Sequence, residues 1–402
     1  MSVPPRRELV RGDLVSAGRR LDDALVVVED GRVAWVGPAR TWPGADDDLP
    51  APAPGRLILP GLVDVHCHGG GGHGFPEGDA DGARAAADHH LLHGTTTLLG
   101  SLVAAPADIL ARRIDALRTL VASGHLAGIH LEGPFLSVAR CGAQDPLSIV
   151  PGDPVLLRRL IDAGEGAVRS MTLAPETPRF AEVLDVLAGA DVTPSFGHTD
   201  ASAGVTTAAI AAGGGRRLGA THLFNAMPPL QHRAPGPVAA CLAAAAQGAM
   251  VVELVGDGVH LADETVATIF ALVGPGQIAL VTDAMAAAGM PDGRYPLGPM
   301  TVDVTGGVAR LATGDGEPGA IAGGTARLID VLRRTVLDAG VSLPDAVTAA
   351  TATPARLVGL DDVGDVVPGR RADLLITDDD LLPRAVMRAG RWVDRTEPTE
   401  VH

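Results

Sequence analysis

Short apolar stretches recur along the middle of the chain and alternate with longer stretches of helical spacing. The segments 108–123, 178–190 and 201–212, rich in Ala and Leu, are typical of helices, and 325–339 and 345–357 predict two more outside the repeat. Strands that alternate with helices pair in parallel, so eight units over about 220 residues predict a (β/α)8 TIM-type barrel, with a doubly wound open sheet as the alternative. The eight strand candidates are 62–66, 95–99, 127–131, 168–173, 191–196, 220–224, 250–255 and 277–282.

Both ends of the chain have the pattern of short strands and turns. Apolar runs at 25–28 and 33–36 flank the turn residues Glu29-Asp30-Gly31, which predicts a hairpin. Near the other end, 372–377 and 385–393 predict two more strands. We therefore expect a small β-sandwich domain built from both termini. The predicted division is 1–57 and 367–402 for the β-sandwich domain and 58–366 for the barrel.

Composition and charge exclude several classes of partner. Hydrophobic residues make up 46% and charged residues 20%, as in ordinary globular proteins. The net charge of −16 opposes binding to nucleic acid or to an anionic membrane surface. No apolar run reaches membrane-spanning length, and no signal peptide is visible. The three cysteines, Cys67, Cys141 and Cys241, lack a metal-like spacing, which indicates reduced thiols and a cytoplasmic protein.

The chain contains no lysine, because all 32 basic residues are arginine. This absence excludes three features that need the lysine amine: a Schiff base, a phosphate-binding loop of the lysine-containing type, and a carbamylated lysine that bridges two metals.

Polar residues follow six of the eight predicted strands. His66 and His68 are two apart, so on an extended strand both side chains point to one side and could bind one metal ion. Taken alone, a histidine that follows a strand could be a hydrogen-bonded surface or core residue, and an aspartate such as Asp283 could be a helix cap. In a barrel, however, the carboxyl ends of all strands meet at one end, which predicts a shared metal site. The residues after the other strands are Glu132, His198, His222, His260 and Asp283.

Several longer motifs surround these residues. They are Pro60-Gly61-Leu62-Val63-Asp64-Val65-His66-Cys67-His68-Gly69, Leu131-Glu132-Gly133-Pro134-Phe135, Gly197-His198-Thr199, Thr221-His222-Leu223-Phe224-Asn225-Ala226-Met227, Asp257-Gly258-Val259-His260 and Val281-Thr282-Asp283-Ala284. In content and order the set resembles the N-acetylglucosamine-6-phosphate deacetylases of the amidohydrolase superfamily. The resemblance covers the whole chain, and the second and fourth motifs are its most specific parts.

The resemblance implies that Glu132, His198 and His222 bind a divalent metal. His66 and His68 are both present as well, so the chain offers ligands for a second metal bridged by Glu132, and we expect one or two ions per subunit. Nitrogen and oxygen ligands suit Zn²⁺ best, with Fe²⁺ or Mn²⁺ as alternatives. The ion would activate water. Asp283 would take the proton of this water and deliver it to the departing nitrogen.

The same resemblance assigns the contacts to a sugar phosphate. The backbone at Asn225 and Ala226 and the side chains of Asn225 and His260 would bind the phosphate. Arg233 would reach into the active site of a neighbouring subunit, which predicts a homodimer. An arginine suits this role because its guanidinium binds phosphate through two parallel hydrogen bonds.

One loop departs from the family pattern. Many relatives have a histidine in a Gly-Ala-His sequence, where this chain has Gly142-Ala143-Gln144. Gln144 could hydrogen-bond a sugar hydroxyl but cannot take a charge. Cys141 lies in the same loop and is expected either to tune its motion or to be an ordinary thiol.

The expected function is hydrolysis of the acetamide of N-acetyl-D-glucosamine 6-phosphate in amino-sugar catabolism. The alternatives are deacetylation of the galactosamine analogue or of another N-acyl sugar, and hydrolysis of a cyclic amide. Cyclic-amide hydrolases commonly need the bridging lysine that this chain lacks. A structural metal-binding protein is the alternative outside enzymes, but such a site has no need for a free carboxylate beside an open position.

Overall fold

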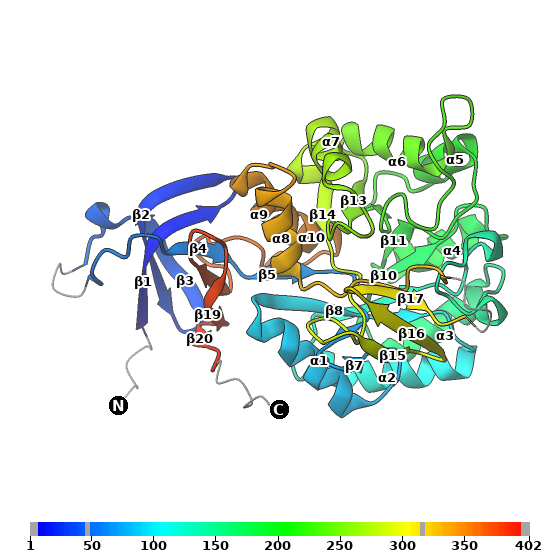
Figure 1. Ribbon diagram of the computed structural model, residues 1–402, viewed down its shortest axis with the longest axis horizontal. Helices are drawn as coiled ribbons and strands as arrows, with labels where there is room; N and C mark the ends of the chain where they lie inside the picture. Colours follow the sequence, from blue (N-terminus) through cyan, green and yellow to red (C-terminus); the bar gives the residue numbers. More distant parts are fainter. Residues whose placement is uncertain (1–6, 45–48, 314–317, 395–402) are drawn as a thin grey trace.

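The computed structural model describes residues 7–44, 49–313 and 318–394. Eight strands form one parallel sheet in which each strand lies beside its sequence neighbour (Figure 1). These strands are β5 (Leu62–Asp64), β8 (Thr95–Val103), β9 (Gly128–Glu132), β10 (Val168–Leu173), β11 (Thr193–Phe196), β12 (Gly219–Ala220), β13 (Val251–Leu254) and β14 (Ile278–Leu280).

The two edges of this sheet meet just beyond β5 and β14. Cys67 and Ala284 form a parallel bridge there. The backbone N–H of Asp283 donates to the carbonyl of His66 over 2.9 Å, and that of His68 donates to Ala284 over 2.6 Å. The sheet therefore closes into a barrel, and the predicted (β/α)8 fold is confirmed.

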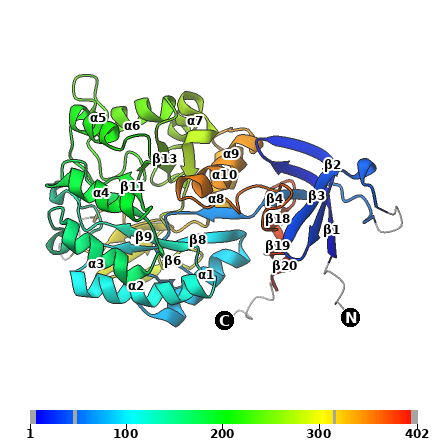
Figure 2. The ribbon, with the colours of Figure 1, turned by 180° about the vertical axis from the view of Figure 1, so that it is seen from behind.

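Helices cover the outside of the barrel (Figure 2). On α2, Leu110, Ile114, Leu117 and Leu120 are buried at helical spacing, so one apolar stripe packs against the sheet. The helices are α1 (Ala80–Leu92), α2 (Ala107–Ala122), α3 (Pro154–Gly164), α4 (Phe180–Gly189), α5 (Ala203–Ala212), α6 (Gly236–Ala246), α7 (Asp263–Val273), α8 (Leu328–Leu337), α9 (Leu343–Ala350) and α10 (Ala352–Leu357).

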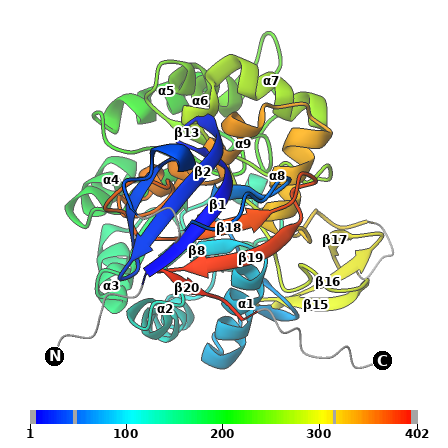
Figure 3. The ribbon, with the colours of Figure 1, turned by 90° about the vertical axis from the view of Figure 1, so that its left-hand side faces the viewer.

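Both ends of the chain build a second unit, a seven-stranded sheet beside the barrel (Figure 3). Its apolar core joins residues of both ends, such as Val10 and Val26 with Leu374 and Met387, as expected for a small sandwich. The division at 57/58 and 366/367 stays a prediction. The strands, in sheet order, are β20 (Arg391–Trp392), β19 (Pro383–Arg388), β18 (Leu374–Thr377), β4 (Leu57–Pro60), β1 (Arg7–Ser16), β2 (Arg19–Glu29) and β3 (Arg32–Pro38).

The hairpin predicted near the start is the β2–β3 pair. Glu29 lies opposite Arg32, so the connecting loop is Asp30-Gly31. The φ angles of Asp30 and Gly31 are 49° and 84°, which suits the two-residue turn that Asp-Gly favours.

Three features differ from the sequence prediction. The strand predicted at 220–224 ends at Ala220, because the chain turns at His222 and Phe224 with φ angles of 30° and 80°. The helix predicted at 345–357 is two helices, separated by the non-helical Thr351. An antiparallel sheet that was not predicted follows β14; its strands are β15 (Gly293–Leu297), β16 (Met300–Thr305) and β17 (Val308–Leu311).

Two short strands, β6 (Gly69–Gly70) and β7 (His73–Gly74), form a small hairpin after the His66–His68 segment.

Across the described part of the chain, no helix combines the length and the apolar composition that a bilayer crossing requires.

Candidate active site

Three side chains from different strand ends form a first group of candidate metal ligands. Glu132 is the last residue of β9, and His198 and His222 follow β11 and β12. Oε1 of Glu132 lies 3.1 Å from Nε2 of His198 and 3.1 Å from Nε2 of His222. The two Nε2 atoms are themselves 3.1 Å apart. Three potential ligand atoms thus converge on one point.

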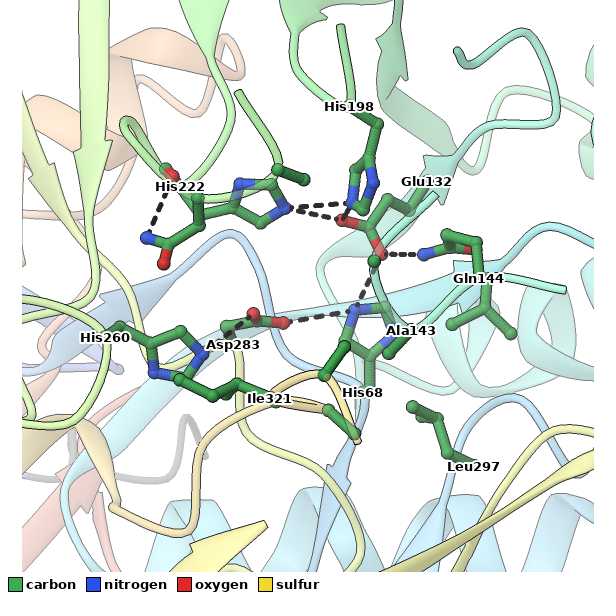
Figure 4. Close-up of a pocket in the computed structure, with 17 residues that line it drawn as sticks. His68, Glu132, Ala143, Gln144, His198, His222, His260, Asp283, Leu297 and Ile321 are labelled. Atoms are coloured by element: carbon green, nitrogen blue, oxygen red, sulfur yellow. Dashed lines mark hydrogen bonds and ion pairs between the residues drawn. The ribbon is translucent and has the colours of Figure 1, made fainter. Parts of the chain in front are cut away.

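A second group lies beside the first and shares Glu132 with it. The Nε2 atoms of His66 and His68 are 3.1 Å apart, and each lies 3.3 Å from Oδ1 of Asp283. Oε2 of Glu132 lies 3.2 Å from Nε2 of His68 (Figure 4). Oε1 of Glu132, which contacts the first group, also lies 3.5 Å from Nε2 of His66. Glu132 therefore contacts both groups, as expected of a bridging carboxylate.

The chemistry and spacing of both groups fit divalent ions. Imidazole nitrogens and carboxylate oxygens are ligands of zinc and of related first-row metals. Ligand atoms of a tetrahedral ion lie about 3.3–3.6 Å apart, close to the separations in both groups. The Nδ1 atoms of His68 and His222 are buried and make no hydrogen bond within the described residues. The Nε2 atoms of the same rings lie 3.1 Å from His66 and from Glu132, respectively, and are therefore the ones directed at the site.

The backbone at three of these residues adopts a conformation that L side chains rarely take. The φ angles of His198, His222 and Asp283 are 47°, 30° and 47°. Residues in this region cost on the order of 1–3 kcal/mol each and persist where the surrounding structure fixes them. At Asp283 that support includes the N–H bond to His66 and an N–H from Gly324 to its own carbonyl at 2.6 Å.

The proximity of buried acids and imidazoles shifts their proton affinities. Burial alone would lower the pKa of His66, but the charges of Asp283 and Glu132 and a hydrogen bond to Glu253 raise it to about 10. The same competition raises the pKa of His68 to about 9, through contacts with Asp283 and Glu132. Burial opposes ionisation of Asp283, yet the His66 and His68 rings hold its pKa below the ordinary value. Asp283 is therefore a carboxylate at neutral pH, able to accept a proton.

His260 reaches the site from the loop after β13. Its Nδ1 lies 2.8 Å from Oδ2 of Asp257, and Oδ1 of Asp257 accepts the backbone N–H groups of Val259 and His260. This pairing directs Nε2 of His260 toward Oδ2 of Asp283, 3.7 Å away. Burial favours a neutral His260, but the hydrogen bond to Asp257 raises the pKa of the imidazole.

An open pocket of about 240 Å³ lies over both groups. His68, Glu132, His198, His222, His260 and Asp283 form part of its wall, together with Asn225, Ala226 and Gln144. The apolar side of the wall holds Ala143 and two residues of the segment after β14, Leu297 and Ile321 (Figure 4). The unpredicted β15–β17 sheet therefore helps to close the site.

The structure places the remaining predicted site residues in different surroundings. His66 is fully buried and is not part of the pocket wall. Cys141 is a free, half-buried thiol, and neither it nor Arg233 is part of the pocket wall. Arg233 is exposed on the loop before α6. Gln144 is 4% exposed and contacts Glu132 directly, a contact that the sequence did not indicate.

Two further polar residues near the site were not predicted as site residues. Glu253, which lies within β13 and contacts His66, escaped the sequence analysis, and Asp257, which pairs with His260, was noted there only as part of a motif. For Glu253 a signal existed, since a charged residue in the apolar run Val251–Leu254 is uncommon in a buried strand unless it has a partner.

A closed parallel barrel with clustered imidazoles and carboxylates at the carboxyl ends of its strands defines a metal-dependent hydrolase of the TIM-barrel class. Residues 57–396 match the Amidohydrolase family, to which the chain therefore belongs. The resemblance found in the motifs is confirmed by its relatives within that family.

Those relatives are deacetylases of amino-sugar phosphates. The N-acetylglucosamine-6-phosphate deacetylase of Bacillus subtilis is 30% identical over 375 residues, which cover 91% of this chain and 92% of the relative. The N-acetylgalactosamine-6-phosphate deacetylase of Escherichia coli O157:H7 is 31% identical and covers 92% and 95% of the two chains. The crystal structure of N-acetyl-D-glucosamine-6-phosphate deacetylase from Mycobacterium smegmatis superposes with a TM-score of 0.89 at 40% identity, over 96% of this chain and all of that one.

Proposed function

We propose that this protein hydrolyses the acetamide of N-acetyl-D-glucosamine 6-phosphate and releases glucosamine 6-phosphate and acetate. The observation that carries the proposal is the position of Asp283, whose carboxylate lies in the pocket wall with Oδ1 3.3 Å from His68 of its own ligand group and Oδ2 3.7 Å from His260. The deacetylases among the relatives match 91% and 96% of this chain.

Glu132, His198 and His222 would hold one divalent ion, and His66, His68 and Asp283, with Glu132 between the groups, a second. We expect Zn²⁺, because all the ligand atoms are imidazole nitrogens and carboxylate oxygens. When bound, such an ion makes water nucleophilic near neutral pH and polarises the amide carbonyl.

Asp283 would move the proton that the reaction requires. Its carboxylate accepts a proton as water adds to the carbonyl carbon, and it returns this proton to the nitrogen as the C–N bond breaks. Acetate and the free amine are then the products. Asp257 fixes the ring of His260, so that Nε2 faces the space beside Asp283, where it can bind an oxygen of the substrate.

The phosphate would be bound best by an arginine, whose guanidinium is always charged. Within the described residues, the pocket wall contains histidines but no arginine. Arg233 of a second chain would supply the missing charge, in a homodimer, while Asn225 and Ala226 contribute polar groups from within the pocket. The exposure of Arg233 supports this role.

Two alternatives have specific support. The relative that acts on N-acetylgalactosamine 6-phosphate is 31% identical to this chain, about as similar as the Bacillus subtilis enzyme at 30% although less similar than the Mycobacterium smegmatis enzyme at 40%. The epimer is therefore the second candidate substrate. A purely structural metal site is disfavoured, because both ligand groups contribute residues to an open pocket.

The cellular setting is a further proposal. Cys67, Cys141 and Cys241 are all unpaired, as expected of a protein in the reducing cytoplasm.

The test is acetate release from a panel of N-acetylated sugars, measured with metal-loaded and chelator-treated protein. N-acetylglucosamine and N-acetylgalactosamine are each supplied with and without the 6-phosphate. We expect turnover of N-acetylglucosamine 6-phosphate to exceed that of the other three sugars. We also expect this turnover to be lost when the chelator removes the metal. Equal turnover with and without the phosphate would refute the proposed substrate.

A further inference from the structure

Glu253 is a buried carboxylate that the reaction described above does not use. It lies in the middle of β13 (Val251–Leu254), at 3% exposure, inside the barrel. A buried charge is costly unless it has partners. Its position therefore calls for a physical role, and its contacts indicate one.

One oxygen of Glu253 contacts members of both ligand groups. Oε2 lies 3.0 Å from Nδ1 of His66, and the same atom accepts the backbone N–H of His222 over 3.2 Å. The contact to His66 is made through the ring nitrogen that faces away from the ligand group. It leaves Nε2 directed at His68 and Asp283.

The four histidines of the two groups differ in what holds their Nδ1 atoms. Nδ1 of His198 lies 2.9 Å from the carbonyl of Arg140. Those of His68 and His222 have no hydrogen-bond partner within the described residues. Of these four Nδ1 atoms, only that of His66 lies beside a carboxylate within the described residues. Such a pairing fixes the ring and its tautomer and makes the other nitrogen a better ligand.

We propose that Glu253 is a positioning residue that determines whether the His66, His68 and Asp283 group binds its own metal ion. It does so by holding His66 with Nε2 toward the site. The inference rests on the proposed function, and it concerns the second ion only. The first group, Glu132 with His198 and His222, keeps its three ligand atoms without the Glu253 carboxylate.

The test is metal binding to chelator-treated protein, followed by calorimetric titration with Zn²⁺. Glu253→Gln preserves size and retains an oxygen that can accept the His222 N–H, but it removes the charged partner of His66. We expect one of two binding events to weaken by about 10- to 100-fold and the other to change by less than about threefold. Glu264→Gln, in the exposed first turn of α7, is the matched control and should leave both events unchanged.

A double substitution separates positioning from a general structural effect. His66→Asn should abolish the same binding event, and Glu253→Gln added to His66→Asn should then have no further effect on the remaining one. Should Glu253→Gln fold poorly, Glu253→Asp keeps the charge but withdraws it from the ring, and the same single event should weaken.

Three results would overturn the inference. Equal weakening of both binding events by Glu253→Gln would indicate a general structural role. A further loss of metal binding when Glu253→Gln is added to His66→Asn would indicate the same. A wild-type protein that binds one ion and still releases acetate would leave the proposed function standing while removing the second site. Selective loss of one event in a protein without deacetylase activity would support the role of Glu253 and refute the function.

Discussion

The side-chain amide of Gln144 connects Glu132 to the backbone of the neighbouring strand. Nε2 of Gln144 donates to Oε2 of Glu132 over 2.6 Å, and Oε1 of Gln144 accepts the N–H of Ala104 over 2.7 Å. Both ends of the amide are therefore used inside the protein. The residue that departs from the family pattern thus fixes the orientation of the carboxylate that both ligand groups share.

Removing this amide should destabilise the protein. Gln144→Ala leaves the buried N–H of Ala104 without its acceptor and Glu132 without a donor, so we expect the free energy of unfolding to fall by about 1–3 kcal/mol. Urea denaturation of the metal-free protein measures it. Gln247→Ala, at an exposed position after α6, is the control and should change stability by less than about 0.5 kcal/mol. Equal effects of the two substitutions would show that the Gln144 contacts contribute nothing.

Replacing the proposed proton carrier should abolish turnover without emptying the site. Asp283→Asn keeps an oxygen toward His66 and His68 but cannot accept a proton, so we expect kcat to fall by about 10²- to 10⁴-fold. Metal analysis should still find an ion at the Glu132, His198 and His222 group. Asp185→Asn, on the exposed face of α4, is the control. Retained turnover in Asp283→Asn would remove Asp283 from the mechanism.

The barrel and its ligand candidates could be predicted because both follow from local pattern. Buried parallel strands are short apolar runs, and their carboxyl ends meet at one place, so residues as far apart as His66 and Asp283 could be assigned to one site. The parts that could not be predicted depend on contacts between distant segments. The pairing of Glu253 with His66 joins the first and seventh barrel strands, and no local pattern encodes it.

The end of β12 shows a second limit. The apolar run 220–224 has the composition of a strand, but His222 and Phe224 adopt positive φ angles that their own side chains do not favour. Tertiary contacts impose this turn. One of them is the bond from the N–H of Leu223 to the carbonyl of Glu253, at 2.9 Å.

If Arg233 binds the phosphate across a dimer, as proposed, its loss should cause a substrate-specific defect. Arg233→Ala should raise KM for the phosphorylated sugar by about 10- to 100-fold, the value of a hydrogen bond to a charged group, and leave KM for the unphosphorylated sugar unchanged. Arg216→Ala, exposed on another loop, is the control. A similar rise for both sugars would exclude a phosphate contact.

Mixing two impaired proteins tests whether Arg233 acts on the partner's site. A mixed dimer contains one Arg233→Ala chain and one Asp283→Asn chain. One of its two sites then has Asp283 from the first chain and Arg233 from the second, whereas the other site lacks both. Random exchange should therefore restore about a quarter of the wild-type activity at limiting substrate. A mixture that is no more active than the average of its two components would place Arg233 in its own chain's site or outside any site.

Asp64 predicts a pH dependence of stability that is independent of catalysis. Its carboxyl is completely buried beneath the site, where Oδ2 accepts the hydroxyl of Thr282 over 2.7 Å. Burial raises the pKa of Asp64 from 3.8 to about 7, although the hydrogen bonds from Thr282 and the N–H of His66 oppose the shift. The folded protein therefore binds this proton more tightly than the unfolded chain does. The resulting stabilisation is complete below pH 3.8 and is lost as the pH rises to about 7.

Asp64→Asn should remove this dependence, because the amide does not titrate and the Thr282 hydroxyl can rotate to accept from it. The free energy of unfolding of the wild type minus that of Asp64→Asn should decrease as the pH rises from 4 to 7. We expect this decrease to be at most about 4 kcal/mol. Urea titrations of both metal-free proteins across this range measure the difference, and the pair of wild type and Asp185→Asn should show none. A difference that instead grows with pH would mean that the folded protein stabilises Asp64 as a carboxylate, with Thr282 and the His66 N–H outweighing the cost of burial.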